Sequence, residues 1–133
     1  MPTEPQIEEA RKKATLAAFE VLKTAAEVVE KIKPLLPNAT KKVEEALLLF
    51  KQAGHLFDEV KEADPIPMRE WQRAKGLCIK ATIDLHTARD LENTIKMNLA
   101  QAERNLVTAK QTYEKSTKEH QAEIIPFRRR NKG

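Results

Sequence analysis

The chain has 133 residues, and its 24 lysines and arginines against 20 aspartates and glutamates give a formal net charge of +4. Three glycines and 5% aromatic residues are too few for a β-sandwich or barrel, which needs turn glycines and bulky strand residues. With 41% hydrophobic residues, the chain is also too apolar for a disordered protein. We therefore expect one folded, all-helical domain.

Prolines divide the chain into helical segments. Proline is tolerated in the first turn of a helix and breaks its interior. The stretches between prolines predict helices at about 4–34 and 38–63, followed by a long third segment. Thr3 and Gln6 form a capping-box pattern before the first helix, and Asn38 or Thr40 can cap the second.

Both of the first two segments carry amphipathic patterns. Apolar residues follow at spacings of three and four from Ile7 to Leu35, and a neighbouring stripe begins at Phe19. In the second segment one stripe contains Phe50 and Phe57, which we interpret as core residues. This stripe is widened by Leu49, Ala53 and Leu56. These patterns predict helices with wide apolar faces.

The third segment carries a seven-residue repeat. One column of the repeat reads Trp71, Cys78, Leu85, Glu92, Leu99, Leu106 and Tyr113. The other reads Ala74, Ala81, Ala88, Ile95, Ala102, Ala109 and Ser116. A repeat held this long is typical of a coiled-coil-like seam, and its alanines favour close approach of a partner helix.

Glu92 interrupts the first column, and we expect Leu91 to replace it one residue early, which places a bend at 87–92. A break there predicts an antiparallel up-and-down bundle of four helices at about 4–34, 38–63, 67–88 and 90–122. The alternative is one continuous helix in place of the last two. Neither glycine nor proline lies at the proposed break, which favours continuity, whereas burial of apolar surface favours the bundle.

The basic charge is concentrated at the end of the chain. Residues 1–63 carry a net charge of −1 and residues 64–123 a net charge of +1, so the whole +4 belongs to residues 124–133. We therefore predict a helical bundle domain at 1–123 and a basic flexible tail at 124–133. The candidate residues for binding an anionic membrane or a nucleic acid are Phe127, Arg128, Arg129, Arg130 and Lys132.

We predict no catalytic, cofactor-binding or metal-binding residues, and no cofactor. His86 and Asp90 are four residues apart and supply two ligands at most, and no phosphate loop or glycine-rich nucleotide turn is present. The single cysteine, Cys78, is interpreted as a small apolar residue. Gly54 and Gly76 are interpreted as sites of close helix contact.

The predicted function is therefore a non-enzymatic protein–protein interaction, adaptor or scaffold module. Its partner is another protein or a second copy, bound through helices. The candidate partner-binding seam consists of Ile95, Leu99, Ala102, Leu106, Ala109 and Tyr113. Trp71 is interpreted as core, with an interface anchor as the alternative. With one cysteine and no apolar stretch long enough to span a membrane or direct secretion, we expect a cytoplasmic protein.

Overall fold

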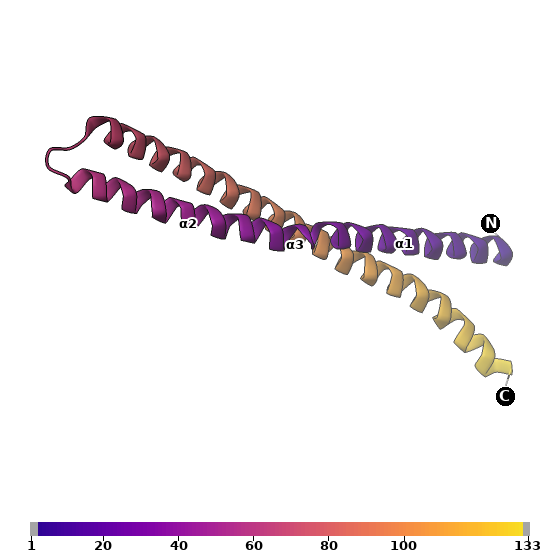
Figure 1. Cartoon of the computed structure of the whole chain (residues 1–133). Coiled ribbons are helices and arrows are strands. Elements are labelled where there is room, and N and C mark those ends of the chain that lie inside the picture. The colour runs from indigo at the N-terminus through magenta and orange to yellow at the C-terminus, as the bar shows by residue number, and fades with distance from the viewer. Residues whose placement is uncertain (1–2, 132–133) are drawn as a thin grey trace. The chain divides into compact units, whose positions relative to one another are not determined.

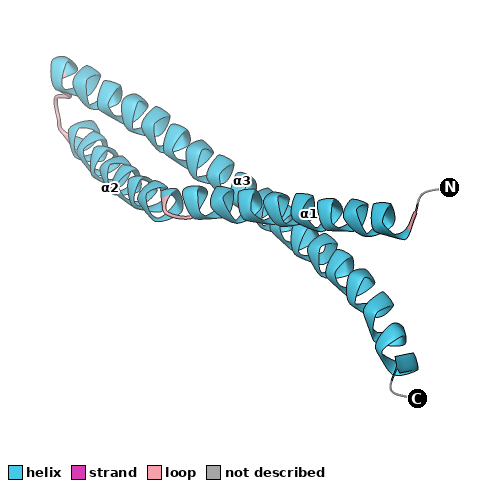
Figure 2. Ribbon diagram, turned by 90° about the vertical axis from the view of Figure 1, so that its right-hand side faces the viewer, coloured by secondary structure: helices cyan, strands magenta, loops and turns pink. Residues whose placement is uncertain are grey.

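The structure is a computed structural model that describes the backbone of residues 3–131 and the side chains of residues 3–118. Three helices account for nearly all of this part of the chain: α1 (Glu4–Ile32), α2 (Leu35–Glu62) and α3 (Met68–Asn131). No strand occurs among residues 3–131. Figures 1 and 2 show these helices and the loop that joins α2 to α3. The all-helical prediction is confirmed.

The prediction of a fourth helix is wrong, because α3 continues without interruption through residues 87–92. The seven-residue repeat does not slip at this point. Leu91 is 45% exposed, while Glu92 keeps its place in the seam and is half-buried. The Glu92 carboxylate accepts a hydrogen bond from the Thr40 hydroxyl of α2, so this polar side chain has a partner within the seam and the helix does not break there. The alternative with one long helix is therefore the observed one.

The junction between α1 and α2 is only two residues long. Pro34 is the residue that precedes α2, and no side chain caps the helix there. Pro37 falls within the first turn of α2, where a missing N–H costs little. The helix therefore starts three residues before the predicted position, and neither Asn38 nor Thr40 serves as its cap. At α1 the Thr3 backbone N–H does donate to the Gln6 Oε1 at 3.0 Å, half of the predicted capping box.

The chain forms two compact units, each a pair of antiparallel helical segments. Unit 1 joins residues 1–31 to residues 99–133, and unit 2 contains residues 32–98. In unit 2 the Cys78 thiol donates to the Ala53 carbonyl at 3.1 Å, and the rings of Phe57 and Trp71 lie 6.0 Å apart. These contacts fix the register of α2 against the first part of α3. Unit 1 has a matching aromatic contact between α1 and the second part of α3.

The buried residues of both units are small. Seven of the eight are alanines: Ala18, Ala39, Ala46, Ala74, Ala81, Ala102 and Ala109. Leu85 is the only larger one among the described side chains. Every position of the two repeat columns of α3 is buried or half-buried. The heptad pattern therefore correctly located the face of α3 that packs, and alanine sets the close spacing of the helices there.

Candidate functional site

The predicted partner-binding seam lies on the packed face of α3. Ala102 and Ala109 are buried, and Leu99, Leu106 and Tyr113 are half-buried in unit 1. The Tyr113 ring lies 5.9 Å from the ring of Phe19, so α1 of the same chain contacts this seam. Ile95 is half-buried in unit 2. A partner would reach these positions only by displacing a helix of the chain itself, and their use by a partner stays a prediction.

Large apolar side chains lie instead on the outer surfaces of the helix pairs. In unit 2 the exposed ones are Leu35, Leu48, Leu49, Phe50, Leu56, Ile66, Met68, Leu77, Ile79, Ile83, Leu91 and Met97. In unit 1 they are Ile7, Leu16, Phe19, Val21, Val28 and Val107. Phe50 was predicted as core, but it is exposed. Two packed helices share only one seam, so side chains one column away from that seam stay in water.

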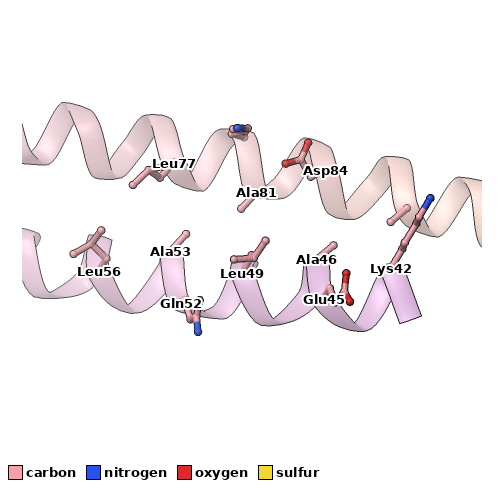
Figure 3. A pocket seen from close by; sticks show the side chains of 12 residues that line it. Lys42, Glu45, Ala46, Leu49, Gln52, Ala53, Leu56, Leu77, Ala81 and Asp84 are labelled. Atoms are coloured by element: carbon pink, nitrogen blue, oxygen red, sulfur yellow. The ribbon is translucent and has the colours of Figure 1, made fainter. Parts of the chain in front are cut away.

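Unit 2 has an open apolar groove of about 540 Å³ between α2 and α3, which we call the groove face. Figure 3 shows its side chains. Leu49 and Leu56 come from α2 and Leu77 from α3, and they flank a floor of Ala46, Ala53 and Ala81. The two leucines of α2 are seven residues apart, as are Ala46 and Ala53. The leucines of the groove face therefore form a stripe beside the packed seam, and the seam alanines Ala46 and Ala81 lie at the bottom of the groove between them.

Four charged side chains line the groove face: Lys42 and Glu45 from α2, and Lys80 and Asp84 from α3. Figure 3 labels Lys42, Glu45 and Asp84. Within the part of the chain whose side chains are described, none of the four belongs to an ion pair. Gln52 completes the polar lining. Both signs of charge thus lie beside the exposed leucines, and their order along the groove restricts what fits it.

The pKa of the Glu92 carboxyl is lowered from its ordinary value. The hydrogen bond from the Thr40 hydroxyl, and then the one from Lys96 at 3.2 Å, lower the pKa of the Glu92 carboxyl below 4.5. A polar residue at one seam position is a known means of fixing the register of paired helices. This contact therefore sets how α2 and α3 align in unit 2.

Two further open spaces lie beside the helices. On another side of unit 2, a space of about 370 Å³ is lined by Phe57, Cys78 and Ile83. In unit 1, a groove of about 980 Å³ is lined mainly by small residues of α1 and α3, such as Ala14 and Thr108, with Val21 and Val28. Each helix pair therefore presents an accessible apolar surface.

The remaining sequence predictions have mixed outcomes. Trp71 is half-buried against Phe57, and the Lys75 ammonium lies 5.0 Å from the Trp71 ring centre. A Cβ added at Gly54 or Gly76 would meet nothing within 4 Å, so neither glycine marks a close helix contact.

The backbone of α3 continues to Asn131. The side chains of Phe127, Arg128, Arg129 and Arg130, and the whole of Lys132, lie outside the described residues.

Among the described side chains, no three His, Cys, Asp or Glu residues are grouped closely enough to hold a metal ion. His86 and Asp90 therefore have no third ligand in this part of the chain. The helices described here contain no stretch that is both long and apolar enough to cross a membrane.

Comparison of the chain with models of protein families, with curated proteins and with solved structures found no match. The candidate site therefore rests on the residues and their arrangement alone.

The groove face itself was not identified from the sequence. Its signal in the sequence is the spacing of seven residues between Leu49 and Leu56 on α2. The same spacing is expected if these residues widen a buried stripe. Whether they are buried or exposed depends on the number of helices that pack around them.

Proposed function

We propose that the chain is a non-enzymatic protein–protein interaction or scaffold module that binds other helices through the exposed apolar faces of its helix pairs. The observation that supports this most directly is the inverted burial of its apolar residues. Alanines occupy the buried seam, while leucines and isoleucines of α2 and α3 face outward. Continuous exposed apolar surface on a protein marks an interaction site.

The energetics favour coverage of these faces. Burying an apolar side chain completely stabilises a protein by about 1.5–3 kcal/mol, so covering a half-exposed leucine contributes about 1 kcal/mol. Leu49, Leu56 and Leu77 lie on one groove, and together they supply several kcal/mol to any helix that fills it. A helix that presents apolar side chains at spacings of three, four and seven residues matches this groove. Binding completes a bundle that the chain alone does not form.

Site-specific photocrosslinking in the protein's native cells tests the proposal. A photoreactive phenylalanine analogue is placed at Leu49 in unit 2 or at Val21 in unit 1, with Lys51 and Lys23 as control positions. Each control lies two residues along the same helix and so on a different face. We expect discrete crosslinked products from Leu49 or Val21 and none from the controls. Absence of products at both groove positions would refute the proposal.

An alternative function is peripheral binding to an anionic membrane or a nucleic acid through residues 124–133. The supporting observation is that these ten residues carry the entire net charge of +4, whereas residues 1–123 are neutral. Binding of this kind weakens steeply with salt. Cosedimentation with vesicles containing anionic lipid, and a parallel titration with RNA, compare the full chain with a chain ending at Glu123. The alternative is wrong if the shorter chain binds as well as the full one.

A further inference from the structure

We propose that the partner for the groove face of unit 2 is a second copy of the chain, packed antiparallel about a two-fold axis. This inference rests on the proposed function and names its partner. The groove face then pairs with itself, and two α2–α3 helix pairs make one antiparallel four-helix bundle. Two features of unit 2 support this partner: the order of charges along the groove and the area of the face.

The register within unit 2 gives the height of each residue along the groove. Ala53 contacts Cys78, and Thr40 contacts Glu92, so each step forward along α2 matches one step back along α3. By this register Leu49 lies level with Thr82 and Ile83. Thr82 is also the midpoint between Lys80 and Asp84 on α3, which are four residues apart.

Consider two copies whose groove faces meet, related by a two-fold axis that crosses the groove at the height of Leu49, at right angles to the helices. This axis places α2 of one copy against α2 of the other, and α3 against α3, with each pair antiparallel. On α3, Lys80 of each copy then faces Asp84 of the other. On α2, Glu45 of each copy faces Gln52 of the other, because these two residues are centred on nearly the same height. One axis at this height therefore pairs polar residues of the two copies on both helices.

The apolar residues fit the same arrangement. Leu49 lies at the axis and meets its own counterpart. Lys42 lies one heptad before Leu49, and Leu56 lies one heptad after it. Lys42 of each copy therefore meets Leu56 of the other copy, and the Lys42 methylene chain can cover that leucine. Alanines at the floor of the groove leave space for leucines from the other copy. An isologous contact of this kind uses one surface patch on both subunits.

The area of the face matches the requirement of a stable dimer. The 28 residues of α2 span about 42 Å, and two packed helices are about 20 Å wide. The whole face of unit 2, with the groove at its centre, therefore has an outline of about 800 Å² per copy, which is close to the area that one partner contributes to a specific interface. The inference needs no contact beyond this unit.

Sedimentation equilibrium of the full chain, over a range of concentrations, tests the inference with two matched variants. Leu49→Glu places a charge at the axis, while Leu48→Glu changes the neighbouring residue, which is 58% exposed against 57% for Leu49 but does not line the groove. We expect a wild-type dimer of twice 15.2 kDa. Leu49→Glu should weaken it by about 30-fold or more, and Leu48→Glu by less than about threefold.

A charge exchange tests the antiparallel pairing separately from folding. Lys80→Asp and Asp84→Lys each place like charges opposite one another in a homodimer, and each should weaken association by about tenfold. Mixing the two variants restores opposite charges at both contacts, and the mixture should form heterodimers within about threefold of the wild-type affinity. Contacts within one helix are not restored by mixing. Circular dichroism checks that both variants keep wild-type helicity.

Three results would overturn the inference: a monomer at all concentrations, equal weakening by Leu48→Glu and Leu49→Glu, or no recovery on mixing. Its failure is distinguishable from failure of the proposed function. If the chain is a monomer but photocrosslinking at Leu49 yields a product with a different protein, self-association is wrong and the interaction module stands. If no groove position yields any product, the proposed function is wrong as well.

Discussion

Leu85→Ala is the substitution that tests the packing of unit 2 most sharply. Leu85 is 5% exposed and is the one large side chain in the buried set of the described region. By the register of unit 2 it lies level with Ala46, which is also buried. Truncation removes the only bulky group that fills the seam at this height, so the free energy of unfolding should fall.

Truncating a buried leucine to alanine costs about 2–5 kcal/mol, depending on how far the site collapses. A seam between two helices opens to grooves on its sides, so neighbouring side chains can move into the space. We therefore expect a loss near the low end, about 2–3 kcal/mol. For a chain of this size that loss lowers the Tm by about 10 °C.

Urea unfolding followed by circular dichroism measures this loss, with Leu48→Ala as the matched control. Leu48 is a leucine of the same unit but is 58% exposed, so its truncation should cost less than about 1 kcal/mol. Measurements at two protein concentrations separate folding from association. Equal losses for the two variants would show that α2 and α3 do not pair in this register.

Three further predictions follow from individual residues. Gly54→Ala and Gly76→Ala should each stabilise the chain by about 0.5–1 kcal/mol in thermal melts, because both lie inside helices with open space for a Cβ. The lowered pKa of Glu92 gives stability that is present above pH 4.5 and is lost as the pH falls through the lowered value. Thr40→Val removes the largest cause, so urea unfolding at pH 7 and pH 3 should show a smaller difference for this variant than for wild type. Glu92→Leu should raise the Tm but weaken the preference for one register. With cysteines placed at Ala53 and Leu77, disulfide trapping should join position 53 to the native Cys78 in the wild-type register, and should also join it to position 77 in the Glu92→Leu variant.

The sequence predicts the packed face of α3 well, because a seven-residue repeat has one spatial meaning on a helix. Ala74, Ala81, Ala102 and Ala109 are all buried where the repeat predicts. The number of helices was not predictable in the same way. Glu92 looks like a fault in the repeat when α3 is considered alone, but Thr40 of α2 supplies its hydrogen bond. A contact between residues 52 positions apart leaves no local signal.

The candidate site was missed for a related reason. Leu49 and Leu56 have the spacing of core residues, and the sequence does not state how many helices surround them. In a bundle of four helices within one chain they would be buried. In unit 2 the helix pair leaves them on its outer side, and the same pattern then describes an exposed apolar face, which we propose as an interaction face. The sequence-based seam at 99–113 is instead contacted by α1 in unit 1.

The central claim is that the seam of α3 is occupied within the chain, while the groove face is free for a partner. Thermal unfolding by circular dichroism at low protein concentration, comparing Leu106→Asp with Leu49→Asp, tests this most directly. Leu106 is half-buried in the seam and Leu49 is exposed in the groove. We expect Leu106→Asp to lose helicity or melt well below wild type, and Leu49→Asp to melt as wild type does. If Leu106→Asp folds normally while Leu49→Asp unfolds the chain, the roles of the two faces are reversed and the account is contradicted.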